Sequence, residues 1–176
     1  MKNPDPQNAT ARLWLKEVIA SHGPALQRYA TRLCGDPHRA KDAVQDTFLR
    51  LAKEKQTKVS GHLQAWLFRV CRTRIIDSHR RDARLQSAES LETIAQTEIE
   101  TRYNPRRVTE DADLHKSILR LVDQLPKAQR EVVRLKFQKE LSYREIAEIT
   151  DQSVSHVGVL LHSALKSLRN QSNHLK

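Results

Sequence analysis

The clearest hydrophobic pattern in the chain lies near its C-terminus, in LSYREIAEITDQSVSHVGVLLHSALKSLR at residues 141–169. Ser142 is followed three residues later by Glu145, a pairing that satisfies free backbone N–H groups at a helix start. The apolar run that follows stops at residues 150–152, where Asp151 suits the left-handed conformation of a tight turn. Ser153 is a suitable cap for a second helix. The apolar positions of that helix recur at steps of three and four and predict one buried face: Val154, Val157, Gly158, Leu161, Leu165 and Leu168. The pattern predicts a helix-turn-helix, whose second helix usually enters the DNA major groove, although an ordinary helical hairpin would show the same pattern.

Four helices are predicted in the first half of the chain. The first covers about 10–21, and Gly23-Pro24 separates it from a second that ends near Cys34. Asp36-Pro37 places an N-cap before a proline at the first helical position, so a third helix starts there and runs to about Glu54. After a loop at 56–61, a fourth helix covers about 62–84.

The helix predicted from Pro37 has two distinct faces. Its inner face is formed by Ala40, Val44, Thr47, Phe48 and Leu51. A second stripe, at steps of three and four, is formed by Asp42, Gln45, Asp46, Leu49 and Lys53. Such a stripe is either a solvated face or, because a leucine stands among acids and an amide, a docking face for a basic partner helix.

The helix predicted at 62–84 carries a basic stripe. Its apolar face comprises Leu63, Trp66, Leu67, Val70, Cys71 and Ile75. Another face comprises Arg69, Arg72, Thr73 and Arg80, and Arg81 and Arg84 extend the positive charge. Phe68 is expected on the exposed side, near Lys55, Lys58 and His62 of the preceding segment. Basic stripes are often only solvated, but an exposed aromatic among cations also suits DNA backbone and unpaired bases.

Composition adds a fold class and a class of partner. Four glycines and six prolines in 176 residues favour long helices over a turn-rich β fold, so the prediction is an all-α protein. The net charge of +10 favours a polyanionic partner, and nucleic acid first. Residues 1–85, 86–113 and 114–176 carry net charges of +9, −4 and +5. We therefore expect two small helical domains, 1–85 and 114–176, joined by a flexible acidic linker at 86–113.

Several classes of function are disfavoured. No apolar run approaches the roughly 18 residues that span a bilayer, and the polar start is unlike a signal peptide, so a cytoplasmic protein is expected. Cys34 and Cys71 belong to no CxxC pair and are expected to be buried free thiols. The eight histidines show no catalytic or metal-ligand spacing, and no glycine-rich phosphate loop is present. An enzyme, a metal site, a cofactor and a small-molecule substrate are accordingly not expected.

Three motifs in order resemble a known family. DAVQDTFLRLAKE (42–54) resembles the polymerase-binding helix of bacterial sigma factors of the extracytoplasmic-function (ECF) group. AWLFRVCRTRIIDSHRR (65–81) resembles the next segment of that group. The segment from Gln124 to Arg169 resembles its C-terminal domain, and the three motifs together cover nearly all of the chain outside the linker.

The resemblance implies a promoter-recognition subunit of bacterial RNA polymerase, with core polymerase and promoter DNA as partners and an anti-sigma factor as an expected regulator. It implies that domain 1–85 docks on the polymerase and opens the −10 element, while domain 114–176 reads the −35 element. The implied polymerase contacts are Asp42, Gln45, Asp46 and Leu49. The implied −10 contacts are Lys58, His62, Phe68, Arg69, Arg72, Thr73, Arg80 and Arg81.

The chain departs from the family in two places. Thr73 stands where the family usually has asparagine, so reading at −10 is expected to differ. The recognition helix has Gly158, Leu160, Ser163 and Leu165 where Lys or Arg is usual, so weak or unusual −35 recognition is expected. The remaining candidate −35 contacts are Gln152, Ser155, His156, Val159, His162 and Lys166. Two alternative functions stay open: a stand-alone helix-turn-helix regulator, and a sigma mimic that titrates an anti-sigma factor.

Overall fold

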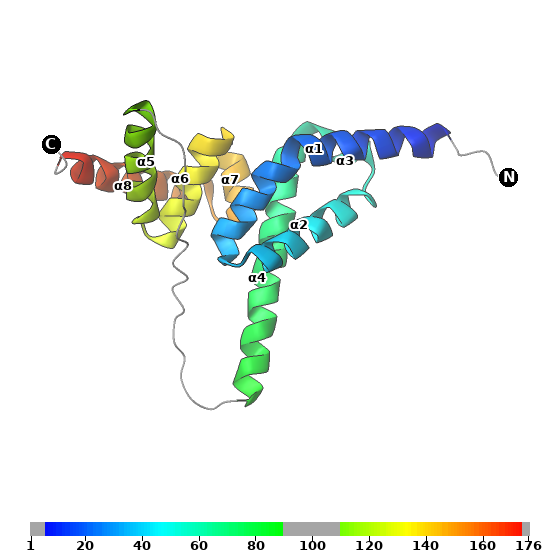
Figure 1. Ribbon diagram of the computed structural model, residues 1–176, viewed down its shortest axis with the longest axis horizontal. Coiled ribbons are helices and arrows are strands. Elements are labelled where there is room, and N and C mark those ends of the chain that lie inside the picture. The colour runs from blue at the N-terminus through cyan, green and yellow to red at the C-terminus, as the bar shows by residue number, and fades with distance from the viewer. Residues whose placement is uncertain (1–5, 90–109, 174–176) are drawn as a thin grey trace. The chain divides into compact units, whose positions relative to one another are not determined.

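The computed structural model describes residues 6–89 and 110–173, and every regular element in those ranges is helical. The first group is α1 (Pro6–Cys34), α2 (Pro37–Leu51), α3 (Gln56–Val59), the 3-10 turn η1 (Ser60–His62) and α4 (Leu63–Glu89). The second is α5 (Glu110–Asp123), α6 (Lys127–Lys139), α7 (Tyr143–Thr150) and α8 (Val154–Asn173). The residue contacts divide the chain into two units that correspond to these groups (Figure 1). The all-α fold with two helical regions is confirmed.

The first unit packs α1, α2 and α4 against one another. Its core includes Leu26, Tyr29, Phe48, Leu51, Leu67, Phe68, Cys71 and Ile75, all at most 9% exposed. The predicted inner face of α2 is confirmed, because all five of its residues are buried. The C-terminal part of α4 extends beyond α1 and α2 (Figure 1).

A single helix occupies the place of the first two predicted helices. The expected break at Gly23-Pro24 is wrong, because α1 runs through Pro24 and only changes direction part-way along (Figure 1). Proline removes one backbone hydrogen bond and bends a helix, but packing against neighbours can hold the helix together. A Cβ at Gly23 would lie 4.0 Å from Phe48 Cε2, so the glycine lies close to α2.

Short hydrogen-bonded turns change two further boundaries. Helix α2 ends at Leu51 rather than Glu54, and the backbone N–H groups of Lys53 and Glu54 donate to Arg50 and Leu51 at 3.0 Å. The segment predicted as a loop at 56–61 forms α3 and the start of η1. Helix α4 also continues past the predicted end at residue 84, to Glu89.

In the second unit, α8 packs on α6 and α7, and α5 contacts α6 and α8. Its core includes Leu125, Val132, Leu135, Ile146, Ile149, Val157, Leu161 and Ala164. Val154 and Leu165 were expected on the buried face of α8 but are 45% and 48% exposed. The packed positions are instead 157, 161 and 164, because Ala164 lies closer than Leu165 to the line through Val157 and Leu161.

The predicted linker falls largely outside the described residues. Of the predicted linker at 86–113, residues 86–89 belong to α4 and residues 110–113 belong to α5. Residues 90–109, and with them the expectation of a flexible acidic connection, lie outside what the structure describes. In the described ranges, no helix combines the length and the apolar character that crossing a bilayer requires.

Candidate polymerase and nucleic-acid interfaces

The outward face of α2 collects the predicted polymerase contacts. Asp36 caps the helix, since its Oδ1 accepts from the N–H groups of His38 at 2.8 Å and Arg39 at 3.3 Å. These two bonds lower the pKa of the Asp36 carboxyl. Because the opposite side is buried against α1 and α4, the α2 outward face (Asp42, Gln45, Asp46 and Leu49) is exposed. Leu49 is 62% exposed, so this face presents an apolar side chain among two acids and an amide.

One acid of this face has a partner within the domain. The Asp46 Oδ2 lies 3.9 Å from the Arg74 Nε on α4, with the two side chains 54% and 31% exposed. This contact joins the α2 outward face to α4. Sequence reasoning missed this pair, because its members are far apart in the chain and only the packing of α2 on α4 brings them together.

Most of the predicted −10 residues lie on the surface of α3, η1 and α4. Lys58, His62, Arg69, Thr73, Arg80 and Arg81 are exposed, and Arg72 is half-buried. The Lys58 Nζ lies 3.3 Å from the Glu54 Oε2, and the Thr73 hydroxyl donates to the Arg69 carbonyl at 2.9 Å. Exposed Asp77 interrupts the positive charge between Thr73 and Arg81. We call Arg69, Thr73, Arg80 and Arg81 the α4 basic stripe.

Phe68 does not belong to this surface. The expectation of an exposed aromatic is wrong: the Phe68 side chain is 1% exposed and lies edge-on to Tyr29, with ring centroids 4.9 Å apart. Helix α4 contacts both α1 and α2, so its buried face is wider than the single apolar stripe that the periodicity predicts. In the folded domain Phe68 is a core residue and is not available to stack on a base.

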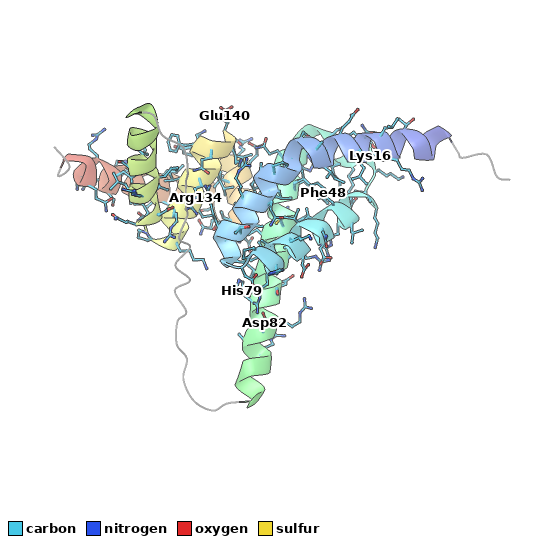
Figure 2. The ribbon with its side chains drawn as sticks, in the orientation of Figure 1. Lys16, Phe48, His79, Asp82, Arg134 and Glu140 are labelled. Carbon is cyan, nitrogen blue, oxygen red and sulfur yellow. The ribbon has the colours of Figure 1, made fainter. Side chains whose placement is uncertain are left out.

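A second long-range ion pair links α2 to the C-terminal half of α4. The Arg39 Nη1 lies 2.5 Å from the Asp82 Oδ2, which joins the first turn of α2 to α4. Asp82 lies on α4 near the level where α2 begins (Figure 2). Arg80 and Arg81 therefore directly precede a residue that contacts α2.

The predicted helix-turn-helix is present in its local details. The Ser142 N–H donates to the Glu145 Oε2 at 2.8 Å, and the Glu145 N–H donates to the Ser142 hydroxyl at 3.3 Å. Asp151 adopts the predicted left-handed conformation, with φ 56° and ψ 48°. The His156 N–H donates to the Ser153 hydroxyl at 3.1 Å, so Ser153 caps α8. Helices α7 and α8 follow each other across this short turn and pack together.

The outward face of α8 carries most of the candidate −35 residues. Ser155, His156, Val159, His162 and Lys166 are exposed, and Gln152 is half-buried in the turn. Leu160, which stands where the family usually has a cation, is half-buried. Gly158 faces α7, where an added Cβ would meet the Tyr143 ring at 3.9 Å, an ordinary contact. Lys166 and Arg169 are the lysine and arginine residues of α8, so its fixed positive charge is low.

The two cysteines take no part in these surfaces. Cys34 and Cys71 are free and buried, as predicted, with exposures of 2% and 0%. Burial raises the pKa of the Cys71 thiol to about 12 and also raises that of Cys34. Such thiols are protonated and unreactive at neutral pH. Among the described residues, no group of three His, Cys, Asp or Glu side chains is arranged to hold a metal ion.

Comparison with known proteins decides the family. Residues 18–85 match Sigma-70 region 2, and residues 115–168 match Sigma-70 region 4. The chain is 31% identical over 175 residues to the RNA polymerase sigma factor YlaC of Bacillus subtilis, covering 96% of this chain and 93% of YlaC. It is also 30% identical over 157 residues to the ECF sigma factor SigL of Mycobacterium tuberculosis, covering 88% of this chain and 86% of SigL. The chain belongs to the ECF group of RNA polymerase sigma factors.

One further sequence relative and two solved structures are also similar to this sigma factor. The ECF sigma factor SigE of Mycolicibacterium smegmatis is 29% identical over 154 residues, which cover 88% of this chain but 60% of SigE. Among solved structures, RpoE of Bartonella quintana, crystallised with NepR, has a TM-score of 0.63 at 24% identity, covering 88% of this chain and 94% of RpoE. CnrH, solved with the cytosolic domain of CnrY, has a TM-score of 0.57 at 22% identity, covering 95% of each chain. As a sigma factor, the protein is a promoter-recognition subunit of RNA polymerase, which removes the stand-alone regulator as an alternative.

Proposed function

We propose that this sigma factor binds core RNA polymerase through the α2 outward face and promoter DNA through α4 and α8. The single observation that carries the proposal is the division of α2 into a fully buried side and an exposed side with Leu49 between acidic and amide groups. A solvated helix face needs no large apolar residue, whereas an interface gains from an apolar anchor with a polar rim. Asp42 and Asp46 supply charge complementary to a basic partner helix.

The proposed −10 surface is the α4 basic stripe with Arg72, Lys58 and His62. Guanidinium groups along one helix suit the phosphates of a duplex and of a separated strand. Extruding a base from the stack costs a few kcal/mol, which stacking and phosphate contacts must offset. Since Phe68 lies in the core, the proposed contribution of this surface is charge and hydrogen bonding rather than stacking on Phe68.

The proposed −35 surface is the outward side of α8, together with Gln152. Because α8 has few fixed cations, it lacks most of the phosphate contacts that set the register of a recognition helix. We expect docking on the polymerase to hold α8 near the promoter and so to raise its effective concentration there.

A protein regulator is part of the proposal. The neighbours RpoE and CnrH are each described in complex with a second protein, the anti-sigma factor NepR and the cytosolic domain of CnrY. We expect an anti-sigma factor to bind this chain as well. The protein would act in the cytoplasm with the polymerase, without a catalytic activity or cofactor of its own.

The test is reconstitution with core RNA polymerase. Asp42→Lys and Leu49→Ala should each weaken binding at least severalfold in a quantitative pull-down, with folding checked by circular dichroism. Asp42 is a sharper choice than Asp46, which also contacts Arg74. Glu17→Lys, an equal charge reversal at an exposed position of α1, is the matched control and should bind like the unchanged protein. Equal affinity of all variants would mean that the polymerase binds a surface other than the α2 outward face. If the unchanged protein binds an anti-sigma factor but not the polymerase, it is a sigma mimic.

A further inference from the structure

An apolar side chain stands in the middle of the polar side of α8. Ser155, Val159, His162 and Lys166 follow one another at helical spacing and all are exposed. Val159 is 60% exposed, although it is the one residue of this row without a polar group. The row lies away from Val157, Leu161 and Ala164, which α6 and α7 cover, so no rotation of α8 could bury Val159 without exposing the core.

A single exposed valine on a protein surface is ordinary and by itself indicates nothing. Its position here is specific, since it is on the second helix of a helix-turn-helix, beyond a cap formed by Ser153. The major groove presents one apolar group on its base edges, the C5-methyl of thymine. Valine has no donor or acceptor, so among base edges it can favour only that methyl group.

Two properties of Val159 suit this contact. In a helix a β-branched side chain has one strongly preferred rotamer, so both methyl groups are held in a defined direction. The chain also lacks lysine or arginine at the neighbouring positions 158–163, so no long side chain of α8 competes for the same part of the groove. The polar neighbours Ser155 and His162 leave Val159 as the apolar contact of the row.

We propose that Val159 reads the methyl group of a thymine in the upstream promoter element and is a specificity-determining residue of this sigma factor. This inference rests on the proposed function, because it requires α8 to enter the major groove. It goes further by predicting an A·T pair at one defined position, recognised through its methyl group rather than through a hydrogen bond.

The test uses holoenzyme reconstituted from core polymerase and the full chain. An upstream element is first selected from duplexes randomised in that region, and each thymine of the selected element is then replaced by deoxyuridine, which removes only the methyl group. At one position the unchanged holoenzyme should lose about fourfold in affinity, equivalent to about 0.8 kcal/mol for one buried methyl-sized group. Val159→Ala should bind the thymine and deoxyuridine duplexes equally.

Val154→Ala is the matched control. Val154 is a valine of the same helix, 45% exposed, but it lies about 140° around the axis from Val159 at about 100° per residue. This variant should keep the fourfold difference. The proposal is overturned if the unchanged holoenzyme is indifferent to deoxyuridine at every position, or if Val159→Ala keeps the difference. A holoenzyme that forms but selects no upstream element would instead overturn the proposed role of α8, and the inference with it.

Discussion

The ring of Phe68 on α4 meets the ring of Tyr29 on α1 edge-on, at an interplanar angle of 65°. Both residues are buried, so this aromatic pair joins two helices at the centre of the first unit. Phe68→Ala should lower the free energy of unfolding by about 3–5 kcal/mol, whereas Phe68→Leu should cost far less. Both tryptophans, Trp14 and Trp66, belong to this unit, so their fluorescence during urea unfolding reports on it. A stable Phe68→Leu protein that has lost promoter binding would contradict the structural role.

The Asp36 cap should make the stability of the first unit depend on pH. Hydrogen bonds from His38 and Arg39 hold the folded pKa of Asp36 below its ordinary value of 3.8. A depressed folded pKa means that the contribution is fully present above the unfolded pKa and is lost as the pH falls through the folded one. The difference in melting temperature between the unchanged protein and Asp36→Ala should therefore be constant near neutral pH and shrink below about pH 4. A difference that grows on acidification would contradict this sign.

The α4 basic stripe should contribute to the salt dependence of promoter binding. Replacing Arg69 or Arg80 by alanine should reduce the slope of log affinity against log salt by about 0.9 for each lost duplex phosphate contact, or about 0.7 for a single strand. Arg28→Ala, which removes an exposed arginine of α1, is the control and should leave the slope unchanged. Titration of holoenzyme on promoter DNA between low and physiological salt gives the slopes. If the double variant Arg69→Ala/Arg80→Ala keeps the original slope, the α4 basic stripe is only solvated and does not contact DNA phosphates.

The ion pair between Arg39 and Asp82 should contribute little to stability. With side chains 47% and 35% exposed, the pair is partly screened by water. A double-mutant cycle with Arg39→Ala and Asp82→Ala should give a coupling energy of at most about 1 kcal/mol, falling further in high salt. A coupling of several kcal/mol, insensitive to salt, would show that the pair is effectively desolvated.

Glu140 occupies a conformation that favours glycine. It ends α6 with φ 56° and ψ 24°, and its N–H donates to the Leu135 carbonyl. Glu140→Gly should raise the free energy of unfolding of the second unit by up to about 1 kcal/mol, because it relieves the strain of a side chain at positive φ. Glu140→Ala, which keeps a Cβ at this position, should not. Thermal unfolding followed by circular dichroism compares the two variants.

Local features of the fold could be predicted because their causes lie within a few residues. The caps at Asp36, Ser142 and Ser153 join a side chain to a backbone N–H no more than three positions away. The left-handed turn at Asp151 likewise depends on one side chain and its neighbours. Helix periodicity then identified the exposed side of α2. These local rules were sufficient for the helix-turn-helix and the α2 outward face.

The burial of Phe68 and the unbroken α1 were decided by tertiary packing. Periodicity assigns one buried face to a helix, but α4 is covered by both α1 and α2, and so Phe68 is buried as well. The same packing holds α1 together across Pro24, where local propensity favours a break. The partners of Asp46 and Asp82 lie on other helices, and attraction between opposite charges acts only once the fold has brought them close. The sequence alone therefore determined the capped starts of α2, α7 and α8 and the family that the chain resembles. Only the tertiary structure decided which side chains are covered, because burial depends on neighbours distant in the chain.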